Sequence, residues 1–398
     1  MNSQLLETYR AIKNVIGDSN DPVALHEPNF IDTEAENYVL NCVRTGWVSS
    51  AGKWVEEFEK KICEYTNSKY AIAVTNGTVG LRLALHLVGV KPSDEVIIPS
   101  LTFVATANSI SHLGGTPHFV DIDEKRLSIC PENLEKHLKN ISKYDKGILY
   151  NKFTNNPIKA IMPVHIFGMP ADMNGIKKIA NIYNLPIVED ASEALGSFII
   201  AKDEKKHCGN LGDVGVLSFN GNKIITTGGG GALITNNKEI ADMARYLSTT
   251  AKKEHPWEFD HDLIGWNDRM PNINAALGVA QLEVFNERLE KKKKLFELYK
   301  KNFESLCDIE LISPPKSCES NHWLISFKML FNDKKNCKKF RSDILELCHS
   351  NRIYLRPIWR ALHTLPMYKD CPSSSLVITE KEASRIISLP SSPQLYKK

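Results

Sequence analysis

Short apolar runs alternate with longer amphipathic stretches between residues 70 and 220. The stretches have the apolar spacing of helices, as at Leu81, Ala84, Leu85 and Val88. Strands that alternate with helices along a chain typically form a mostly parallel sheet covered by those helices. We therefore predict an α/β fold with a mostly parallel central sheet. The predicted strands lie at 71–74, 95–98, 116–120, 160–164, 187–189 and 214–218.

The pattern changes toward the C-terminus. After residue 271, heptad-like apolar spacing predicts a helix that runs toward Phe296, and strand and helix then alternate through 323–330 and 340–350. This pattern indicates a second, smaller α/β domain. We predict an N-terminal arm at 1–35 that packs on the small domain or on a dimer partner, a large domain at 36–280 and a small C-terminal domain at 281–398.

Four consecutive lysines at 291–294 resemble a binding or localisation patch when they are taken alone. They lie within the predicted helix, whose apolar positions include Leu289, Phe296 and Leu298. A charged run on an amphipathic helix is usually its solvated face, and we expect that arrangement here.

The charge of the chain is nearly balanced, since 50 basic and 47 acidic residues give a formal net charge of +3 over 398 residues. This balance gives no reason to expect nucleic acid or a membrane surface as a partner. No segment approaches the ~20 apolar residues of a membrane span, and the N-terminus lacks a signal-peptide pattern, so we expect a cytoplasmic protein. The nine scattered cysteines are expected to be reduced thiols, and the spacing of the histidines predicts no structural metal.

Lys223 is the most informative residue, because it lies between the predicted strand at 214–218 and the four glycines 228–231. Glycines in a row cost conformational entropy unless the backbone must stay bare or adopt positive φ, so a bulky group is expected beside the lysine. A lysine held in such a place is a candidate Schiff-base residue for a carbonyl such as that of pyridoxal phosphate. The alternative is a glycine-rich turn with a lysine that points into water.

Two further segments supply the groups that pyridoxal phosphate needs. Asp190 stands where the predicted strand at 187–189 ends, and an acid there could pair with the ring nitrogen of the cofactor; the alternative is a helix cap. Glu193 is either a capping-box partner or a second group over the cofactor ring. A helix is predicted to begin at Gly77 and Thr78, whose backbone N–H groups would suit a single phosphate, with Ser218 as a hydroxyl donor from the other side.

Six motifs occur in order along the chain, at 76–78, 99–108, 163–168, 189–196, 218–223 and 265–271. On these motifs the chain resembles the DegT/DnrJ/StrS family of pyridoxal-phosphate sugar aminotransferases, over nearly its whole length. The resemblance implies fold type I, the aspartate aminotransferase-like fold, with the cofactor bound by the domain at 36–280. It also implies pyridoxal phosphate as the cofactor and a homodimer with a shared active site. Further motifs, around Leu25–Pro28 and Trp47–Lys53, look like the branch of the legionaminic acid synthesis aminotransferase.

The resemblance assigns roles to single residues at the cofactor. Lys223 would be the Schiff-base lysine that moves the proton of the substrate carbon, and Asp190 would pair with the pyridinium. The ring of Phe103 would stack on the cofactor, although it could simply fill core. The phosphate would be bound by Gly77, Thr78 and Ser218, joined by Asn267 from the neighbouring subunit.

For the substrates, the resemblance implies L-glutamate as amino donor and a nucleotide-linked 4-keto-6-deoxy-N-acetylhexosamine, carrying uridine or guanosine diphosphate, as acceptor at C4. Such a reaction serves bacterial surface polysaccharide or nonulosonic acid synthesis. Amination at C3 and dehydration of a deoxysugar are the alternatives, although dehydrating relatives have histidine where this chain has Lys223. A non-catalytic regulatory protein on the same fold is a further alternative. Candidate substrate contacts are Trp47, Ser49, Arg269 and Arg356. Arg269 could instead form an ion pair at an interface.

Overall fold

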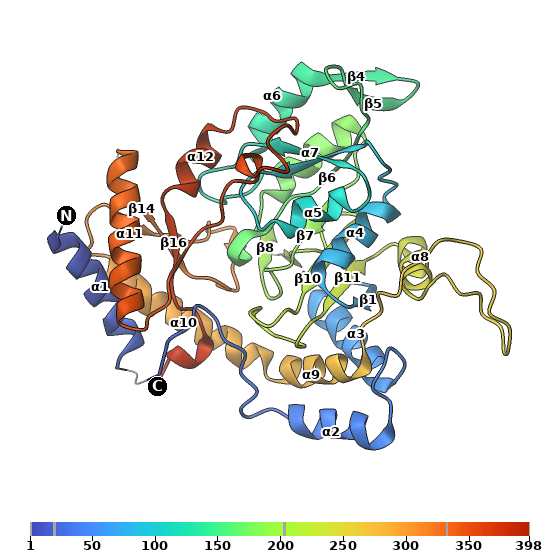
Figure 1. The fold of residues 1–398 in the computed structure, drawn as a ribbon, viewed down its shortest axis with the longest axis horizontal. Helices are drawn as coiled ribbons and strands as arrows, with labels where there is room; N and C mark the ends of the chain where they lie inside the picture. Colours follow the sequence, from blue (N-terminus) through green and yellow to red (C-terminus); the bar gives the residue numbers. More distant parts are fainter. Residues whose placement is uncertain (1, 19–20, 202–203, 332, 398) are drawn as a thin grey trace.

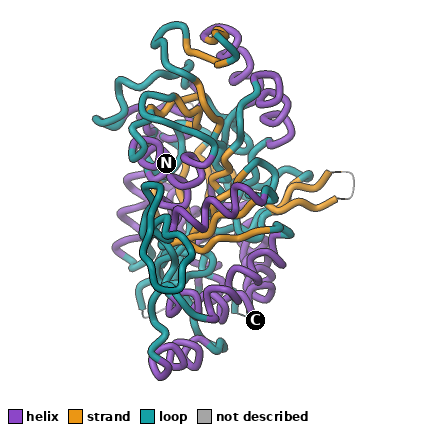
Figure 2. The backbone as a smooth tube through the Cα atoms, turned by 90° about the vertical axis from the view of Figure 1, so that its right-hand side faces the viewer, coloured by secondary structure: helices purple, strands orange, loops and turns teal. Residues whose placement is uncertain are grey.

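The computed structural model describes residues 2–18, 21–201, 204–331 and 333–397. A large sheet with helices on both sides forms one part of the molecule, and a smaller sheet with α1, α10 and α11 forms the other (Figure 1). The tube view shows the strands of the large sheet running between layers of helix (Figure 2). Both ends of the chain lie on the side of the smaller sheet.

The large sheet has seven strands in the order β1-β11-β10-β7-β6-β2-β3. Parallel bridges at Ile161–Ile187 and Val164–Asp190 join its two halves. Only β11 runs antiparallel to its neighbours within this sheet, so the predicted mostly parallel sheet is confirmed. The strands are β1 (Tyr70–Val74), β2 (Glu95–Pro99), β3 (Thr116–Val120), β6 (Ile158–Ile161), β7 (Val188–Asp190), β10 (Val214–Ser218) and β11 (Gly231–Thr235).

Two differences from the predicted strands have physical reasons. Regular pairing of β6 ends at Ile161 instead of 164, because Pro163 has no N–H to donate to a neighbouring strand, although Met162 still donates to Ile97. The strand β11 was not predicted, because it begins inside the glycine run, whose composition is typical of a turn.

Both faces of the large sheet are buried, and alternate residues of each strand enter different cores. Ala71 and Ala73 of β1 pack in a cluster with α3, α6 and α7, whereas Ile72 and Val74 pack in a second cluster with α4, α5 and α8. This three-layer arrangement explains why the strands are apolar throughout. The helices are α2 (Ala35–Thr45), α3 (Lys53–Thr66), α4 (Gly77–Leu87), α5 (Ala105–Ser111), α6 (Pro131–Ile141), α7 (Met173–Tyr183), α8 (Lys238–Ser248) and α9 (Asn272–Glu283).

The smaller sheet is antiparallel, in the order β12-β14-β16-β15, and its core includes Phe327 and Phe340. The single helix predicted after 271 is two helices that meet at Val284. Residues 362–376 return to the large sheet, where Leu362 and Tyr368 pack beside Phe119. The elements are α10 (Phe285–Phe303), β12 (Ile309–Leu311), β14 (Ser326–Met329), α11 (Lys334–Ser350), β15 (Arg356–Pro357), α12 (Val377–Ala383) and β16 (Ile386–Ser388).

Short strands and turns complete the chain outside the two sheets. One hairpin, β8 with β9, extends from the body of the molecule in Figure 2. The remaining elements are β4 (Ser142–Asp145), β5 (Ile148–Asn151), η1 (Ile166–Gly168), β8 (Phe198–Ala201), β9 (Glu204–His207), β13 (Cys318–Glu319), η2 (Leu362–Thr364) and η3 (Pro393–Leu395).

The first helix, α1 (Asn2–Ile16), packs against α10 and α11, and its apolar residues join the small-sheet core. The following chain runs along the same part of the molecule, where Val23 pairs with Ile353. The N-terminal arm thus contacts the C-terminal part of its own chain.

The expectation of a solvated lysine run at 291–294 is wrong for one member. Lys293 and Lys294 are exposed, but Lys292 is completely buried. The reason is helical periodicity: Lys292 lies four residues after Arg288 and three before Leu295, which are also buried on the inner side of α10.

The described residues contain neither a membrane-spanning helix nor a cluster of metal ligands. None of its helices has the length and apolar content needed to cross a membrane. Among the same residues, no three His, Cys, Asp or Glu side chains form a group that could hold a metal ion.

Candidate active site

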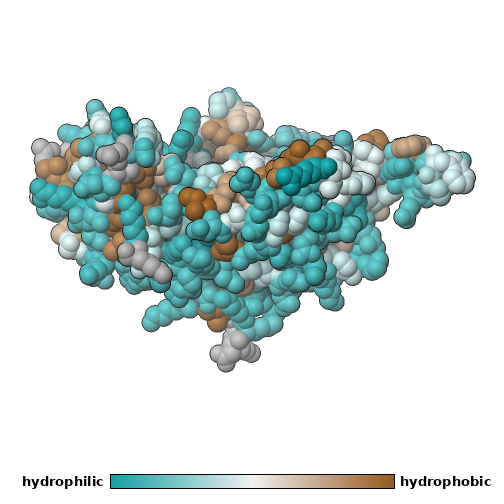
Figure 3. Space-filling view, turned by 90° about the horizontal axis from the view of Figure 1, so that it is seen from below, coloured by the Kyte–Doolittle hydropathy of each residue, from teal (hydrophilic) through white to brown (hydrophobic). Residues whose placement is uncertain are grey.

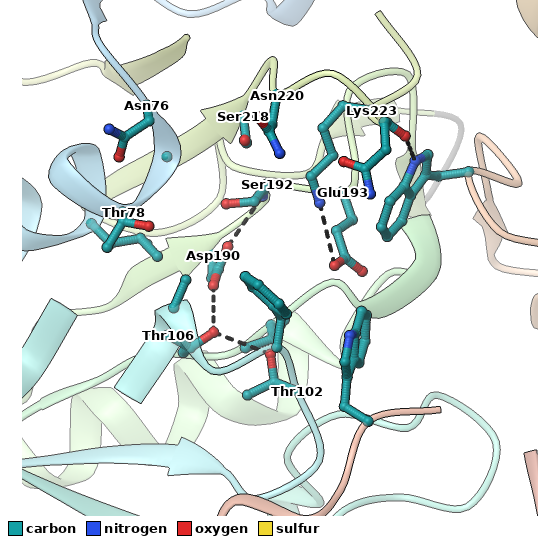
Figure 4. Close-up of a pocket in the computed structure, with 18 residues that line it drawn as sticks. Asn76, Thr78, Thr102, Thr106, Asp190, Ser192, Glu193, Ser218, Asn220 and Lys223 are labelled. Carbon is teal, nitrogen blue, oxygen red and sulfur yellow. Dashed lines mark hydrogen bonds and ion pairs between the residues drawn. The ribbon is translucent and has the colours of Figure 1, made fainter. Parts of the chain in front are cut away.

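A cavity of about 300 Å³ lies where β7 and β10 end and α4 begins (Figure 4). Such an edge, at the carboxyl ends of parallel strands, is where open α/β sheets bind their ligands. Trp323 and Trp359, from the part of the chain that carries the smaller sheet, close one side of the cavity. The other lining residues are Asn76, Gly77, Thr78, Leu81, Thr102, Phe103, Ala105, Thr106, Val164, Asp190, Ser192, Glu193, Ser218, Asn220, Asn222 and Lys223.

Lys223 stands in the loop between β10 and β11, and its amine points into the cavity. Its Nζ lies 3.5 Å from Glu193 Oε1 and 3.9 Å from the centroid of the Trp323 ring. Trp323 is itself held by a 2.8 Å hydrogen bond from its Nε1 to the carbonyl of Asn222. Because only 12% of the lysine side chain is exposed, the amine lies between a carboxylate and an aromatic face, largely shielded from water.

Glu193 is buried beside the lysine, and its Oε2 accepts a 2.7 Å hydrogen bond from the backbone N–H of Phe167. Burial raises the pKa of this carboxyl, and nearby Asp190 raises it further, while Lys223 and the Phe167 N–H act in the opposite direction. The Glu193 carboxyl is therefore placed where it can hold or release a proton next to the lysine amine.

Asp190 ends β7 at the floor of the cavity. Its Oδ2 accepts a 2.7 Å hydrogen bond from Thr106 Oγ1, and its Oδ1 accepts one of 3.2 Å from the N–H of Ser192. Thr106 in turn contacts Thr102 at 3.1 Å (Figure 4). Two donors thus hold the carboxylate in one orientation, with an oxygen available to a cationic group in the cavity.

The preceding residue, Glu189, holds the end of β7 in place from the opposite face. Its carboxylate lies 2.9 Å from His165 Nε2 and accepts hydrogen bonds from the N–H groups of Gly209, Leu211 and Gly212. Burial would raise the pKa of Glu189, but these contacts lower it below its usual value. This network makes the position of Asp190 rigid.

The N-terminus of α4 forms the opposite corner of the cavity. Asn76 caps the helix by accepting a 3.0 Å hydrogen bond from Val79 N–H, so the first N–H groups of the helix face Ser218 across the corner. A Cβ added at Gly77 would lie 2.9 Å from Ser218 Cβ, which shows that only glycine leaves this corner open. The combination of a helix N-terminus, a hydroxyl and a bare backbone suits a single phosphate.

We expect Gly77→Ala to weaken binding of a phosphate-bearing cofactor. The new methyl would meet Ser218 and close the corner, and loss of one charge-assisted hydrogen bond raises a dissociation constant by about tenfold or more. Fluorescence titration of the apoprotein with pyridoxal phosphate measures this change. Gly221→Ala is the matched control, because nothing lies within 4 Å of a Cβ at that position; equal affinity of the two variants would contradict the assignment of this corner.

Phe103 forms the rim of the cavity and is 48% exposed. Its ring lies 5.9 Å from that of Trp359, which lies 5.3 Å from the ring of Phe167. Phe103 is thus not a core residue, and its exposed face is available to stack on a planar ligand.

The predicted substrate residues, and Asn267, which was predicted to bind the cofactor phosphate of the neighbouring subunit, do not line the lysine cavity within this chain. Trp47 is 59% exposed and Ser49 is exposed beside it. Asn267 is exposed and pairs with Thr249, while Arg269 continues along β1 through a bridge to Val74. Their roles at the site stay predictions.

Arg356 lines a second cavity of about 590 Å³, which we call the vestibule. The vestibule shares Phe103, Trp323 and Trp359 with the lysine cavity, so the two are adjoining spaces. A ligand larger than the cofactor would extend into it.

Several site residues were not found from the sequence. Thr106 lies within the motif at 99–108, at the start of α5, and Thr102 precedes that helix. Trp323 and Trp359 come from the C-terminal part of the chain and carry no local signal, because their position depends on how the two parts of the chain pack.

Comparison with known proteins supports the geometry. Residues 29–398 match the model of the DegT/DnrJ/EryC1/StrS aminotransferase family. A GDP-perosamine synthase of Escherichia coli O157:H7 is 35% identical over 373 residues, which cover 94% of each chain. EpsN of Bacillus subtilis, which is provisionally named a pyridoxal phosphate-dependent aminotransferase, is 34% identical over 86% of this chain and 82% of its own length. The crystal structure of a DegT DnrJ EryC1 StrS aminotransferase from Brucella abortus matches with a TM-score of 0.80 and 29% identity over 90% of each chain. The predicted type I fold and the predicted cofactor are confirmed.

When bound, pyridoxal phosphate supplies a carbonyl that accepts amines and a ring that withdraws electrons from the substrate carbon. The residues of this cavity fit that group. Gly77, Thr78 and Ser218 would hold its phosphate, Asp190 would orient it through the ring nitrogen, and the Nζ of Lys223 would take and return the proton of the substrate carbon. With its motifs, its fold and these residues in agreement, the chain belongs to the DegT/DnrJ/EryC1/StrS aminotransferase family.

Proposed function

We propose that this aminotransferase moves an amino group from L-glutamate to C4 of a nucleotide-linked 4-keto-6-deoxy-N-acetylhexosamine. The observation that carries the proposal is the placement of the Lys223 amine, 3.5 Å from the Glu193 carboxylate and on the face of Trp323, opposite Asp190. An amine so shielded suits proton transfer at a substrate carbon more than a surface role. It also disfavours the alternative of a non-catalytic protein, in which such an arrangement has no use.

The nucleotide is proposed to be guanosine or uridine diphosphate, with guanosine tested first. Support for that order comes from the relative named GDP-perosamine synthase. The vestibule supports an acceptor with a large extension, since its 590 Å³ adjoin the lysine cavity and its walls include Tyr354, Arg356 and Trp359. We place the reaction in the cytoplasm, in bacterial surface polysaccharide or legionaminic-type nonulosonic acid synthesis.

The test incubates the holoenzyme with L-glutamate and a matched set of 4-keto-6-deoxyhexoses linked to GDP or UDP, with and without the N-acetyl group at C2. Product mass and NMR should show an amine at C4, formed together with one 2-oxoglutarate per turnover. An amine at C3, or a product that has lost water, would favour the alternatives of C3 amination or dehydration and overturn the proposal.

We further propose that the enzyme is a homodimer in which Asn267 completes the phosphate site of its partner. Its exposed position in this chain, outside the lysine cavity, is what such a role requires. Large exposed apolar side chains occur on the loop before Asn267, which projects beyond α8 in Figure 1. Others occur in α2 and in the residues that follow it. Figure 3 shows separate apolar groups on the face seen from below. We propose that these side chains, which gather on two segments of the chain, lie in the dimer interface. They are Leu40, Val43, Trp47, Val48, Trp257, Phe259, Leu263 and Ile264.

A further inference from the structure

His26 has an unusual environment in the wall of the vestibule. It is only 8% exposed, yet within the described ranges neither ring nitrogen has a hydrogen-bond partner. A buried polar group without a partner costs folding free energy, so a structure that retains one usually has a use for it. The vestibule is the space that both His26 and Arg356 line.

The backbone around His26 is held firmly in place. Val23 accepts a hydrogen bond from Tyr354 N–H, Leu25 accepts one of 2.7 Å from Ser391 N–H, and Glu27 N–H donates to Ser392 Oγ at 2.9 Å. Contacts on both sides of His26 therefore tie the arm to the sheet that carries Arg356. The missing partner of the imidazole is not explained by a loose backbone.

Two buried basic side chains, Lys292 and Arg288, stand behind this wall, and burial holds the pKa of the Lys292 amine well below its usual range. Lys292 donates to the carbonyls of Trp323 and Ser391, and Arg288 donates to the carbonyl of Asn29 and to Gln281 Oε1. All four acceptors are neutral oxygens, which satisfy the hydrogen bonds without supplying a negative charge. An anion that enters the vestibule would supply that charge.

The charge state of His26 follows from the same surroundings. Burial holds the pKa of His26 well below its usual range, and Lys292, Arg288 and Lys223 lower it further. At neutral pH the ring is uncharged, with one N–H that donates and one nitrogen that accepts. His26 can thus donate to an oxygen atom of a ligand, while the guanidinium groups of Arg288 and Arg356 provide the attraction for a negative charge.

We propose that the vestibule is a subsite for an oxyanion of a substrate, in which His26 donates a hydrogen bond to the anion and Arg356 pairs with it from the rim. The inference rests on the proposed function for the identity of the substrates, of which two carry such groups. The anion is either the side-chain carboxylate of the amino donor or the diphosphate of the nucleotide sugar. Both are recognised by the same chemistry, and only binding measurements separate them.

The test compares His26→Leu and Arg356→Gln holoenzymes with the wild type, by calorimetric titration with glutarate in one arm and with GDP or UDP in the other. Leucine keeps the apolar bulk and removes both nitrogens, so the ligand-free His26→Leu protein should melt at the wild-type temperature or above it. For one of the two probes, both variants should bind about tenfold or more weakly, while the absorbance of the bound cofactor is unchanged. That probe identifies the source of the anion.

His322→Asn and Arg360→Gln are the matched controls. His322 is a half-buried histidine stacked on Phe296, and Arg360 is exposed four residues after Arg356; neither lines the vestibule. Wild-type affinity of both His26→Leu and Arg356→Gln for both probes would overturn the inference, as would a lower melting temperature of His26→Leu with unchanged affinity. If the wild-type protein formed no amino sugar but both variants bound a probe more weakly, the subsite would be supported and the proposed function would be wrong.

Discussion

Replacement of Lys223 by alanine should abolish amino transfer, with a loss of at least about 10³-fold in turnover. Among the described residues that line the cavity, Lys223 supplies the basic group beside Glu193 and the face of Trp323, and alanine removes the amine that would take the proton of the substrate carbon. The cofactor should still bind through its phosphate, but its absorbance should shift to that of the unattached aldehyde. Steady-state assay and absorption spectra of the purified protein measure both effects.

Lys238→Ala serves as control for this variant, because its side chain is 70% exposed on α8, where it pairs with Asp242. The same inactive chain also tests the shared site. Mixed with Asn267→Ala chains under subunit exchange, Lys223→Ala chains should regain part of the activity, since a mixed dimer contains one site with both residues intact. Absence of any rescue would count against the contribution of Asn267 across the interface, and near-normal turnover of Lys223→Ala alone would remove the lysine from the mechanism.

Asp190→Asn should lower turnover by on the order of 10²- to 10³-fold. Asparagine has nearly the same shape and keeps an oxygen for the Thr106 hydroxyl, so the fold should be retained. The negative charge that would stabilise a protonated ring nitrogen is lost, and with it the electron withdrawal on which the chemistry depends. Single-turnover rates at saturating cofactor isolate this effect from weaker binding.

Two further variants, of graded expected effect, serve as comparisons for Asp190→Asn. Thr106→Val removes one hydrogen bond to Asp190 and should cost only about tenfold, while Asp242→Asn, an exposed carboxylate, should cost nothing. If Asp190→Asn were no worse than Thr106→Val, the charge at this position would have no role.

The local pattern of apolar and polar residues was sufficient to predict most strands of the large sheet. The strands β3 and β10 have the predicted bounds, because apolar runs between helices have few other folded arrangements. The position of Asp190 at the end of β7 and of Gly77 at the start of α4 also followed from short-range signals, a strand end and a helix start. The strand β11 was not predicted, because it begins in a glycine run and glycine has no side chain whose pattern could indicate a strand.

The features that were not predicted depend on packing between segments that lie far apart in the chain. Helix α10 was recognisable as amphipathic, but the run at 291–294 gave no sign that Lys292 faces the core, because the direction of a helix face depends on what packs against it. The walls that Trp323 and Trp359 supply likewise depend on how the C-terminal part of the chain packs against the large sheet.

By itself the sequence determined the cofactor and the family, since the lysine, the acid and the phosphate corner each lie in a short motif whose local structure follows from a few neighbouring residues. Only the tertiary structure decided how these motifs meet in one cavity, and that Glu193 and Trp323 enclose the amine of Lys223. The same holds for His26 and Arg356, which are 330 positions apart in the chain and line one vestibule. The physical reason is that contacts between distant segments depend on the packing free energy of the whole chain, which no local pattern contains.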